Sequence, residues 1–162
     1  MTTFRINAFV AFGAILLPSL LSAEGRRTRG HDVRPSEVVN FHADLDAAAA
    51  IPGNSEPAAG DVEGTYDTTT HVLKYRAHFV DLSGPATNAK FHGPAAFDRT
   101  SWAVVAAPRP EASLVEGTAW LSKEEELDLL GGRWYFNVTT QKHPQGEIRG
   151  MVHIVPSQSA RR

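Results

Sequence analysis

The chain has 162 residues, of which 42% are hydrophobic and 21% charged, and this fits one globular domain with a sizeable core but leaves no room for a second. A formal net charge of −2 gives no overall basic field, which argues against nucleic acid as a partner. There is no cysteine, so packing alone must stabilise the fold, and small disulfide-stapled scaffolds are excluded.

The N-terminal segment is typical of a secretory signal peptide. Arg5 supplies a weakly positive start, residues 8–21 are mainly apolar, and Ala23 offers a small residue for cleavage. The apolar stretch is too short for a comfortable membrane span. We therefore expect residues 1–23 to be removed on export, leaving a periplasmic or secreted protein with no membrane span. The alternative is an uncleaved N-terminal anchor.

Residues 24–37 carry polar side chains and no apolar periodicity, which indicates a flexible linker. The cationic residues there could contact anionic lipid or polysaccharide, but a solvated tail is the simpler interpretation; they are Arg26, Arg27, Arg29 and Arg34. We expect the folded domain over residues 38–156 and a loose tail over residues 157–162.

Period-2 alternation predicts the first strands of this domain. A strand is expected over residues 39–45, followed by a crossing loop that Pro52 and Gly53 introduce. Residues 62–66 and 72–80 are expected to form a hairpin. In the second strand of the hairpin one face is apolar, with Leu73, Tyr75, Ala77 and Phe79. The other face should meet water or a partner, with Lys74, Arg76 and His78.

Short strands are expected next, over residues 89–92, 102–106 and 115–121, each bounded by glycine, proline or polar residues. One helix follows. Ser122 and Glu125 form a capping box, and Gly131 with Gly132 ends the helix. Its apolar side is predicted from Leu127, Leu129 and Leu130, and the acidic run 124–126 is predicted to be its first turn, where the helix dipole favours negative charge.

The last two strands are predicted to pair as a hairpin across residues 141–145. In the first strand, the apolar residues Trp134, Phe136 and Val138 alternate with Tyr135 and Asn137. In the second strand, the apolar residues Ile148, Val152 and Ile154 alternate with Arg149 and His153. Many short strands with one brief helix predict an all-β fold, an antiparallel β-sandwich or flattened Greek-key-like barrel.

Two glycine-bracketed motifs stand out: Phe91-His92-Gly93-Pro94-Ala95 and Gly146-Glu147-Ile148-Arg149-Gly150. Between them are residues 134–140, which contain Asn137, and then His143-Pro144. Together, over residues 39–155, they resemble the CHRD (chordin-type) domain. The resemblance implies a β-rich, non-enzymatic extracellular module whose motif residues here are His92, Gly93, Pro94, Asn137, Gly146, Glu147, Arg149 and Gly150. The absence of cysteine fits a bacterial exported member better than a cysteine-rich animal matrix protein.

Seven histidines without cysteine raise the hypothesis of a copper or zinc site. The resemblance implies a histidine pair before the Gly-Pro-Ala turn and one more in the Asn-Val-x-Thr strand, but Lys90 and Thr139 stand at two of these positions. His92 is then the only histidine at the positions that the resemblance implies, and the ammonium group of Lys90 beside it repels cations. We therefore expect no metal and no cofactor, with His92, His143 and His78 as weak candidates. No spaced partner is evident for His42, His71 or His153.

Glu147 and Arg149 lie two residues apart and share one strand face. An ion pair that fixes the register of the last strand is the favoured interpretation. The alternative makes Arg149 a binder of anions or carboxylates. No Gly-x-Ser-x-Gly elbow, phosphate loop or His-Glu-x-x-His pattern occurs in the sequence, so nothing indicates an enzyme.

The sequence therefore favours an exported, non-catalytic module that binds an as yet unnamed protein or cell-envelope component. A copper- or zinc-binding redox protein similar to superoxide dismutase, with a degenerate metal site, is the alternative. A purely structural envelope protein is the third hypothesis.

Overall fold

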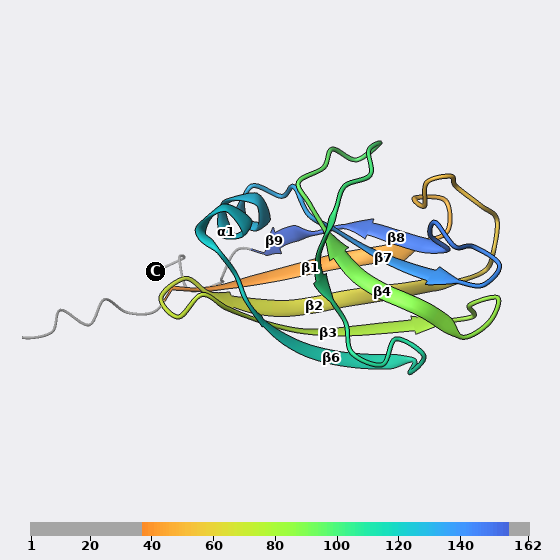
Figure 1. Ribbon diagram of the computed structural model, residues 1–162, viewed down its shortest axis with the longest axis horizontal. Coiled ribbons are helices and arrows are strands. Elements are labelled where there is room, and N and C mark those ends of the chain that lie inside the picture. Colours follow the sequence, from red (N-terminus) through yellow and green to blue (C-terminus); the bar gives the residue numbers. More distant parts are fainter. Residues whose placement is uncertain (1–36, 156–162) are drawn as a thin grey trace, which may run out of the picture. The chain divides into compact units, whose positions relative to one another are not determined.

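The computed structural model describes residues 37–155, which form nine strands and one helix (Figure 1). The elements are β1 (Val38–Asp46), β2 (Ala59–Asp67), β3 (Val72–Val80), β4 (Ala86–His92), β5 (Ala103–Ala106), β6 (Leu114–Trp120), α1 (Lys123–Leu130), β7 (Tyr135–Thr140), β8 (Ile148–Met151) and β9 (His153–Val155). The predicted signal peptide, almost all of the predicted linker and the predicted tail lie outside the described residues.

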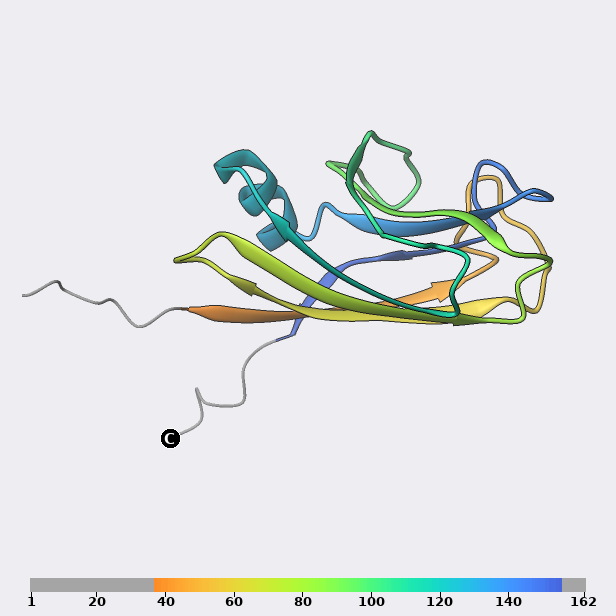
Figure 2. The ribbon, with the colours of Figure 1, turned by 60° about the horizontal axis from the view of Figure 1, so that its bottom comes forward.

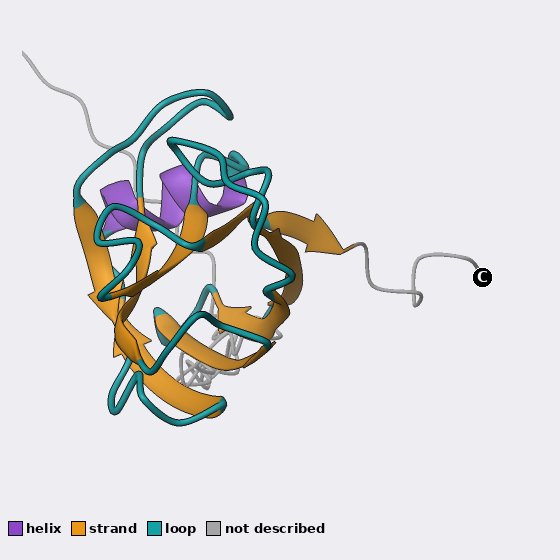
Figure 3. Cartoon of the chain, turned by 90° about the vertical axis from the view of Figure 1, so that its right-hand side faces the viewer, coloured by secondary structure: helices purple, strands orange, loops and turns teal. Residues whose placement is uncertain are grey.

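All strand pairings are antiparallel, in the order β5-β4-β7-β8-β1-β2-β3-β6, and β9 also pairs with β1. The sheet turns over on itself, so that β1, β2 and β3 lie in one layer and β4 and β7 in the other (Figure 2). Figure 3 looks along the resulting flattened, nearly closed barrel. The predicted all-β sandwich with one short helix is confirmed.

The core lies between the two layers. In β3 the four predicted core residues are buried, and Lys74, Arg76 and His78 are exposed, as predicted. Phe91 of β4 stands at the centre, because its ring makes edge contacts with Tyr75, Phe41 and Phe136 at centroid distances of 5.0, 6.1 and 4.7 Å. Since the rings come from both layers, this aromatic cluster joins them directly.

One row of the inner face alternates aromatic residues with glycine. The register places Phe41 beside Gly64, Gly64 beside Tyr75, and Tyr75 beside Gly117. A side chain at Gly64 would collide with the Phe41 ring, and one at Gly117 would collide with the Tyr75 ring. Each ring therefore lies across the neighbouring glycine. This leaves space in the core above the row for the Phe91 ring.

The capping box of α1 forms as predicted: Glu125 N donates to Ser122 Oγ over 3.3 Å, and Ser122 N donates to Glu125 Oε2 over 2.7 Å. The predicted apolar side is wrong in part. Leu129 is fully buried, whereas Leu127 is 54% exposed and Leu130 is also exposed. This short helix buries one of its three leucines and leaves the others in water.

Strand β7 is buried on both faces. Trp134, Phe136 and Val138 belong to the core, as predicted, and pair formation between β7 and β8 confirms the predicted hairpin. Tyr135 and Asn137 point to the opposite face, but they are buried too. A second polar layer therefore lies outside the core.

Candidate functional site

The buried polar residues outside the core include a stack of three side chains on neighbouring strands, namely His92, Tyr135 and Arg149. The His92 and Tyr135 rings are parallel within 8°, with centroids 4.9 Å apart. Arg149 Cζ lies 3.8 Å from the centroid of the Tyr135 ring. The register explains the stack, since His92 of β4 pairs with Tyr135 of β7, and Arg149 of β8 pairs with Asn137 in the same face of β7.

Hydrogen bonds tie the segment 93–102 to this stack. Ser101 N donates to Tyr135 Oη over 2.9 Å, and the Ser101 carbonyl lies 3.0 Å from His92 Nδ1. Arg149 Nη2 donates to the Arg99 carbonyl over 2.6 Å. The backbone of the segment is thus held at several points, while Phe97 and Trp102 are 68% and 86% exposed.

Arg149 is only 2% exposed, and no carboxylate of residues 37–155 lies within ion-pair distance of it. Burial lowers the pKa of Arg149 and also that of His92. The cation–π contact with Tyr135 offsets part of the lost hydration, but Arg149 Nη1 has no hydrogen-bond partner in the described part of the chain. The predicted pairing of Glu147 with Arg149 is therefore wrong.

Glu147 has other partners. Its carboxylate is fully buried and accepts hydrogen bonds from Ser83 N at 2.6 Å, from Ser83 Oγ and from Thr140 Oγ1. Burial alone raises the pKa of Glu147, but these hydrogen bonds together outweigh it and leave the pKa below its ordinary value. Glu147 therefore ties the loop between β3 and β4 to the end of β7.

The glycines of the two motifs are points of close approach. A side chain at Gly93 would collide with the Trp134 indole, and one at Gly150 would collide with the Asp44 carbonyl. Gly146 has φ 155°, and the Asn137 side chain occupies the space beside its Cα while Asn137 Nδ2 donates to the Gln145 carbonyl over 3.0 Å. These positions require glycine for packing and backbone conformation.

The three weak metal candidates lie at different places. His92 is in the stack, His143 Nε2 lies 3.2 Å from Glu56 Oε1, and His78 Nδ1 lies 3.9 Å from Asp61 Oδ1. Within residues 37–155 no three His, Asp or Glu side chains are grouped as metal ligands.

The register also separates the positions that the family resemblance implied. Thr139 pairs with Asn88, four residues along β7 from the Tyr135 that faces His92, a distance of about 13 Å. Side chains at positions 92 and 139 therefore do not converge on one ion.

Glu126, in the first turn of α1, has buried contacts that local sequence patterns do not predict. Glu126 is 4% exposed, and it accepts a hydrogen bond from Tyr66 Oη at 2.7 Å, lies 2.9 Å from His71 Nδ1 and pairs with Lys123. The hydrogen bonds from Lys123 and Tyr66 lower the pKa of Glu126. Glu126 thus has a tertiary role beyond the predicted first helical turn, and it was not predictable because Tyr66 is 60 residues away.

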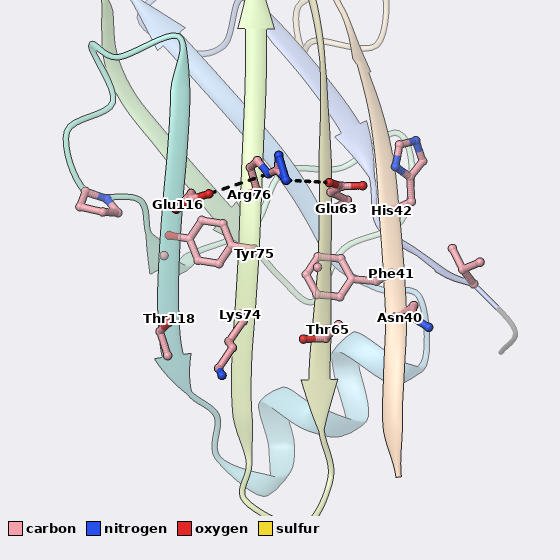
Figure 4. Close-up of a pocket in the computed structure, with 14 residues that line it drawn as sticks. Asn40, Phe41, His42, Glu63, Thr65, Lys74, Tyr75, Arg76, Glu116 and Thr118 are labelled. Carbon is pink, nitrogen blue, oxygen red and sulfur yellow. Dashed lines mark ion pairs between the residues drawn. The ribbon is translucent and has the colours of Figure 1, made fainter. Parts of the chain in front are cut away.

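The outer face of β1, β2, β3 and β6 has a hollow that is lined by both polar and apolar residues (Figure 4). One row across it consists of His42, Glu63, Arg76 and Glu116. Arg76 lies 3.8 Å from Glu63 and 3.9 Å from Glu116. A second row consists of Asn40, Thr65, Lys74 and Thr118. Lys74 is its one charged residue, and the other three are uncharged and polar. We refer to these two rows as the polar sheet face.

Comparison with known families identifies the fold. The family model of the CHRD domain matches residues 41–152. The chain belongs to the CHRD domain family. No curated protein and no solved structure matched it.

In this CHRD domain, most motif residues bury their side chains or backbone in contacts within the fold. His92, Asn137, Glu147 and Arg149 bond to backbone or side-chain groups of nearby loops. The polar sheet face differs, because its charged side chains are exposed. No helix of residues 37–155 has both the length and the apolar character needed to cross a bilayer.

Proposed function

We propose that this protein is an exported, non-catalytic CHRD module that binds a protein or a cell-envelope component through the polar sheet face. The observation that carries the proposal is the hollow itself, which presents charged and hydrogen-bonding side chains from four adjacent strands. A rigid sheet holds these groups in fixed register, so a partner meets a preorganised surface.

The charged groups of this face are available to a partner. Arg76 and its two carboxylate neighbours are more than half exposed, and their ion pairs are long at 3.8 and 3.9 Å. Exposed pairs of this kind contribute about 0–1 kcal/mol to stability. Replacing them with contacts to a partner therefore costs the domain little, and the alternating charges give the partner a defined register.

Export and the absence of catalysis rest on other support. The apolar segment 8–21 with Ala23 behind it has the pattern of a signal peptide. Glu147 and Arg149, the two charged residues of the last motif, are engaged inside the fold. The first point supports export, and the second supports a binding role over hydrolysis.

Site-specific photo-crosslinking of the full chain in its native cells tests this proposal. A crosslinker at Thr118 of the polar sheet face should capture a saturable partner, and Arg76→Ala should reduce the capture. A crosslinker at Asn88, exposed on β4, is the matched control and should capture nothing comparable. Equal capture from both positions would contradict the assigned surface. Absence of any saturable partner would favour the purely structural envelope protein.

A further inference from the structure

Strands β1 and β9 bring two histidines together that are far apart in the sequence. His42 pairs directly with His153, and the next pair is Phe41 with Ile154. Because Phe41 is buried and Ile154 packs on the core, the histidines point to the outer face. Directly opposed residues of antiparallel strands have Cβ atoms roughly 4.5–5.5 Å apart. Two imidazoles at that separation can reach one ion.

Carboxylates surround this histidine pair. Asp44 lies on the same face of β1, and its Oδ1 is 3.0 Å from His42 Nε2. Asp44 and His153 also line one groove. On the other side of His42, Glu63 of β2 is its direct partner in the sheet. The negative charges of Asp44 and Glu63 favour a bound cation beside His42. His92 differs, because the positively charged Lys90 lies two residues away on the same face.

We propose that His42 and His153 form a cross-strand site for Cu²⁺, Ni²⁺ or Zn²⁺, with Asp44 as a third donor. Imidazole nitrogen suits all three ions, and copper should bind most tightly. Without an ion the three side chains are not grouped as ligands. The His153 side chain is exposed, so it can turn towards His42 by rotation about its side-chain bonds when the metal binds. Water completes the coordination.

This site shares His42 with the polar sheet face, but it does not depend on the proposed binding function. It also differs from every metal candidate of the sequence, because neither His42 nor His153 has a suitably spaced neighbour along the chain. Metal binding would join β1 to the last strand of the domain. An ion that binds only the folded chain stabilises it by mass action.

Calorimetric titration of the full chain with CuCl₂ or NiCl₂, after treatment with a chelator, tests the proposal. We expect one tight equivalent in the unmodified protein. His42→Ala and His153→Ala should each weaken the metal affinity roughly tenfold or more. The remaining imidazole then binds the ion without a second imidazole held close to it. The matched control is His78→Ala, which should bind as the unmodified protein does. His78 is on the same sheet face and 49% exposed, but Asp61 and Leu114 are its partners in the register.

Asp44→Asn tests the third donor and should weaken the binding less than either histidine substitution. Unchanged affinity in both His42→Ala and His153→Ala would overturn the proposal. So would an equal loss in His78→Ala, because the metal would then bind imidazoles without selection. A loss with His42→Ala but not with His153→Ala would also overturn the cross-strand site. Thermal unfolding of each variant without metal shows that the fold is retained.

Discussion

Buried charged side chains in this domain are stabilised in different ways. Glu147 and Glu126 each accept several hydrogen bonds, and both have a lowered pKa. Among residues 37–155, Arg149 contacts one carbonyl and one aromatic ring but no carboxylate. Hydrogen bonds to the ionised form of a carboxylate make the folded state prefer that form. The two glutamates therefore make the stability of the domain depend on pH.

We expect Glu147→Gln to flatten the acid limb of the stability profile. Because the pKa of Glu147 is lower in the folded than in the unfolded chain, its stabilisation is complete above the unfolded value and is lost as the pH falls through the folded value. Melting temperatures between pH 7 and pH 3 should therefore fall less steeply in the variant, although it is less stable at pH 7. Glu124→Gln, at an exposed position, is the control and should follow the unmodified protein. A slope for Glu147→Gln as steep as that of the control would refute the prediction.

At the scale of elements, β7 and the segment 93–102 depend on each other. Tyr135 of β7 and Arg149 of β8 are buried on the outer face, where both are bonded to the backbone of the segment. Tyr135 contributes both a ring in the stack and a hydroxyl that accepts from Ser101 N. Removal of the hydroxyl alone separates these contributions.

The Tyr135 hydroxyl accepts from Ser101 N over 2.9 Å and donates to the Ser101 carbonyl over 3.4 Å. Tyr135→Phe should therefore destabilise the domain by about 1 kcal/mol or more, since one hydrogen bond contributes about 1 kcal/mol, and should speed amide exchange at Ser101. Tyr75→Phe is the matched control. Tyr75 is also buried, but burial is the cause of its raised pKa and no hydrogen bond within the described residues contributes. Chemical denaturation should show little change for Tyr75→Phe. Unchanged stability and unchanged amide exchange at Ser101 in Tyr135→Phe would mean that the hydroxyl of Tyr135 does not anchor the segment.

Elements with local signals could be predicted from the sequence. The β2–β3 hairpin, the capping box at Ser122 and the β7–β8 hairpin each depend on residues that are close along the chain. The contacts of Glu126 and Arg149 depend on how distant segments pack together, and the pairing of His42 with His153 depends on the register between distant strands. Alternation indicates which face a residue occupies, but it does not indicate which strand lies next to it.

At the scale of the whole molecule, the described residues 37–155 enclose the family match over residues 41–152. Residues 24–35 carry no apolar face that could add to the core. The expectation that the folded unit begins near residue 38 therefore stays a prediction from the sequence.

Deletion of residues 24–35 should leave the melting temperature nearly unchanged, because a polar segment without apolar periodicity has little surface to bury. Differential scanning calorimetry of the two forms measures this. A fall of about 5 °C or more, equivalent to roughly 1 kcal/mol for a domain of this size, would show that the segment packs on the domain.

The pairing of β1 with β8 and β9 also has a consequence for biosynthesis. Strand β1 is the first of the domain to leave the ribosome, and its hairpin partner β2 follows at once. Its other edge is completed only by the last two strands. A nascent chain that lacks its C-terminal residues therefore presents an open β edge, which invites mispairing. The native domain can close only after synthesis has reached β9.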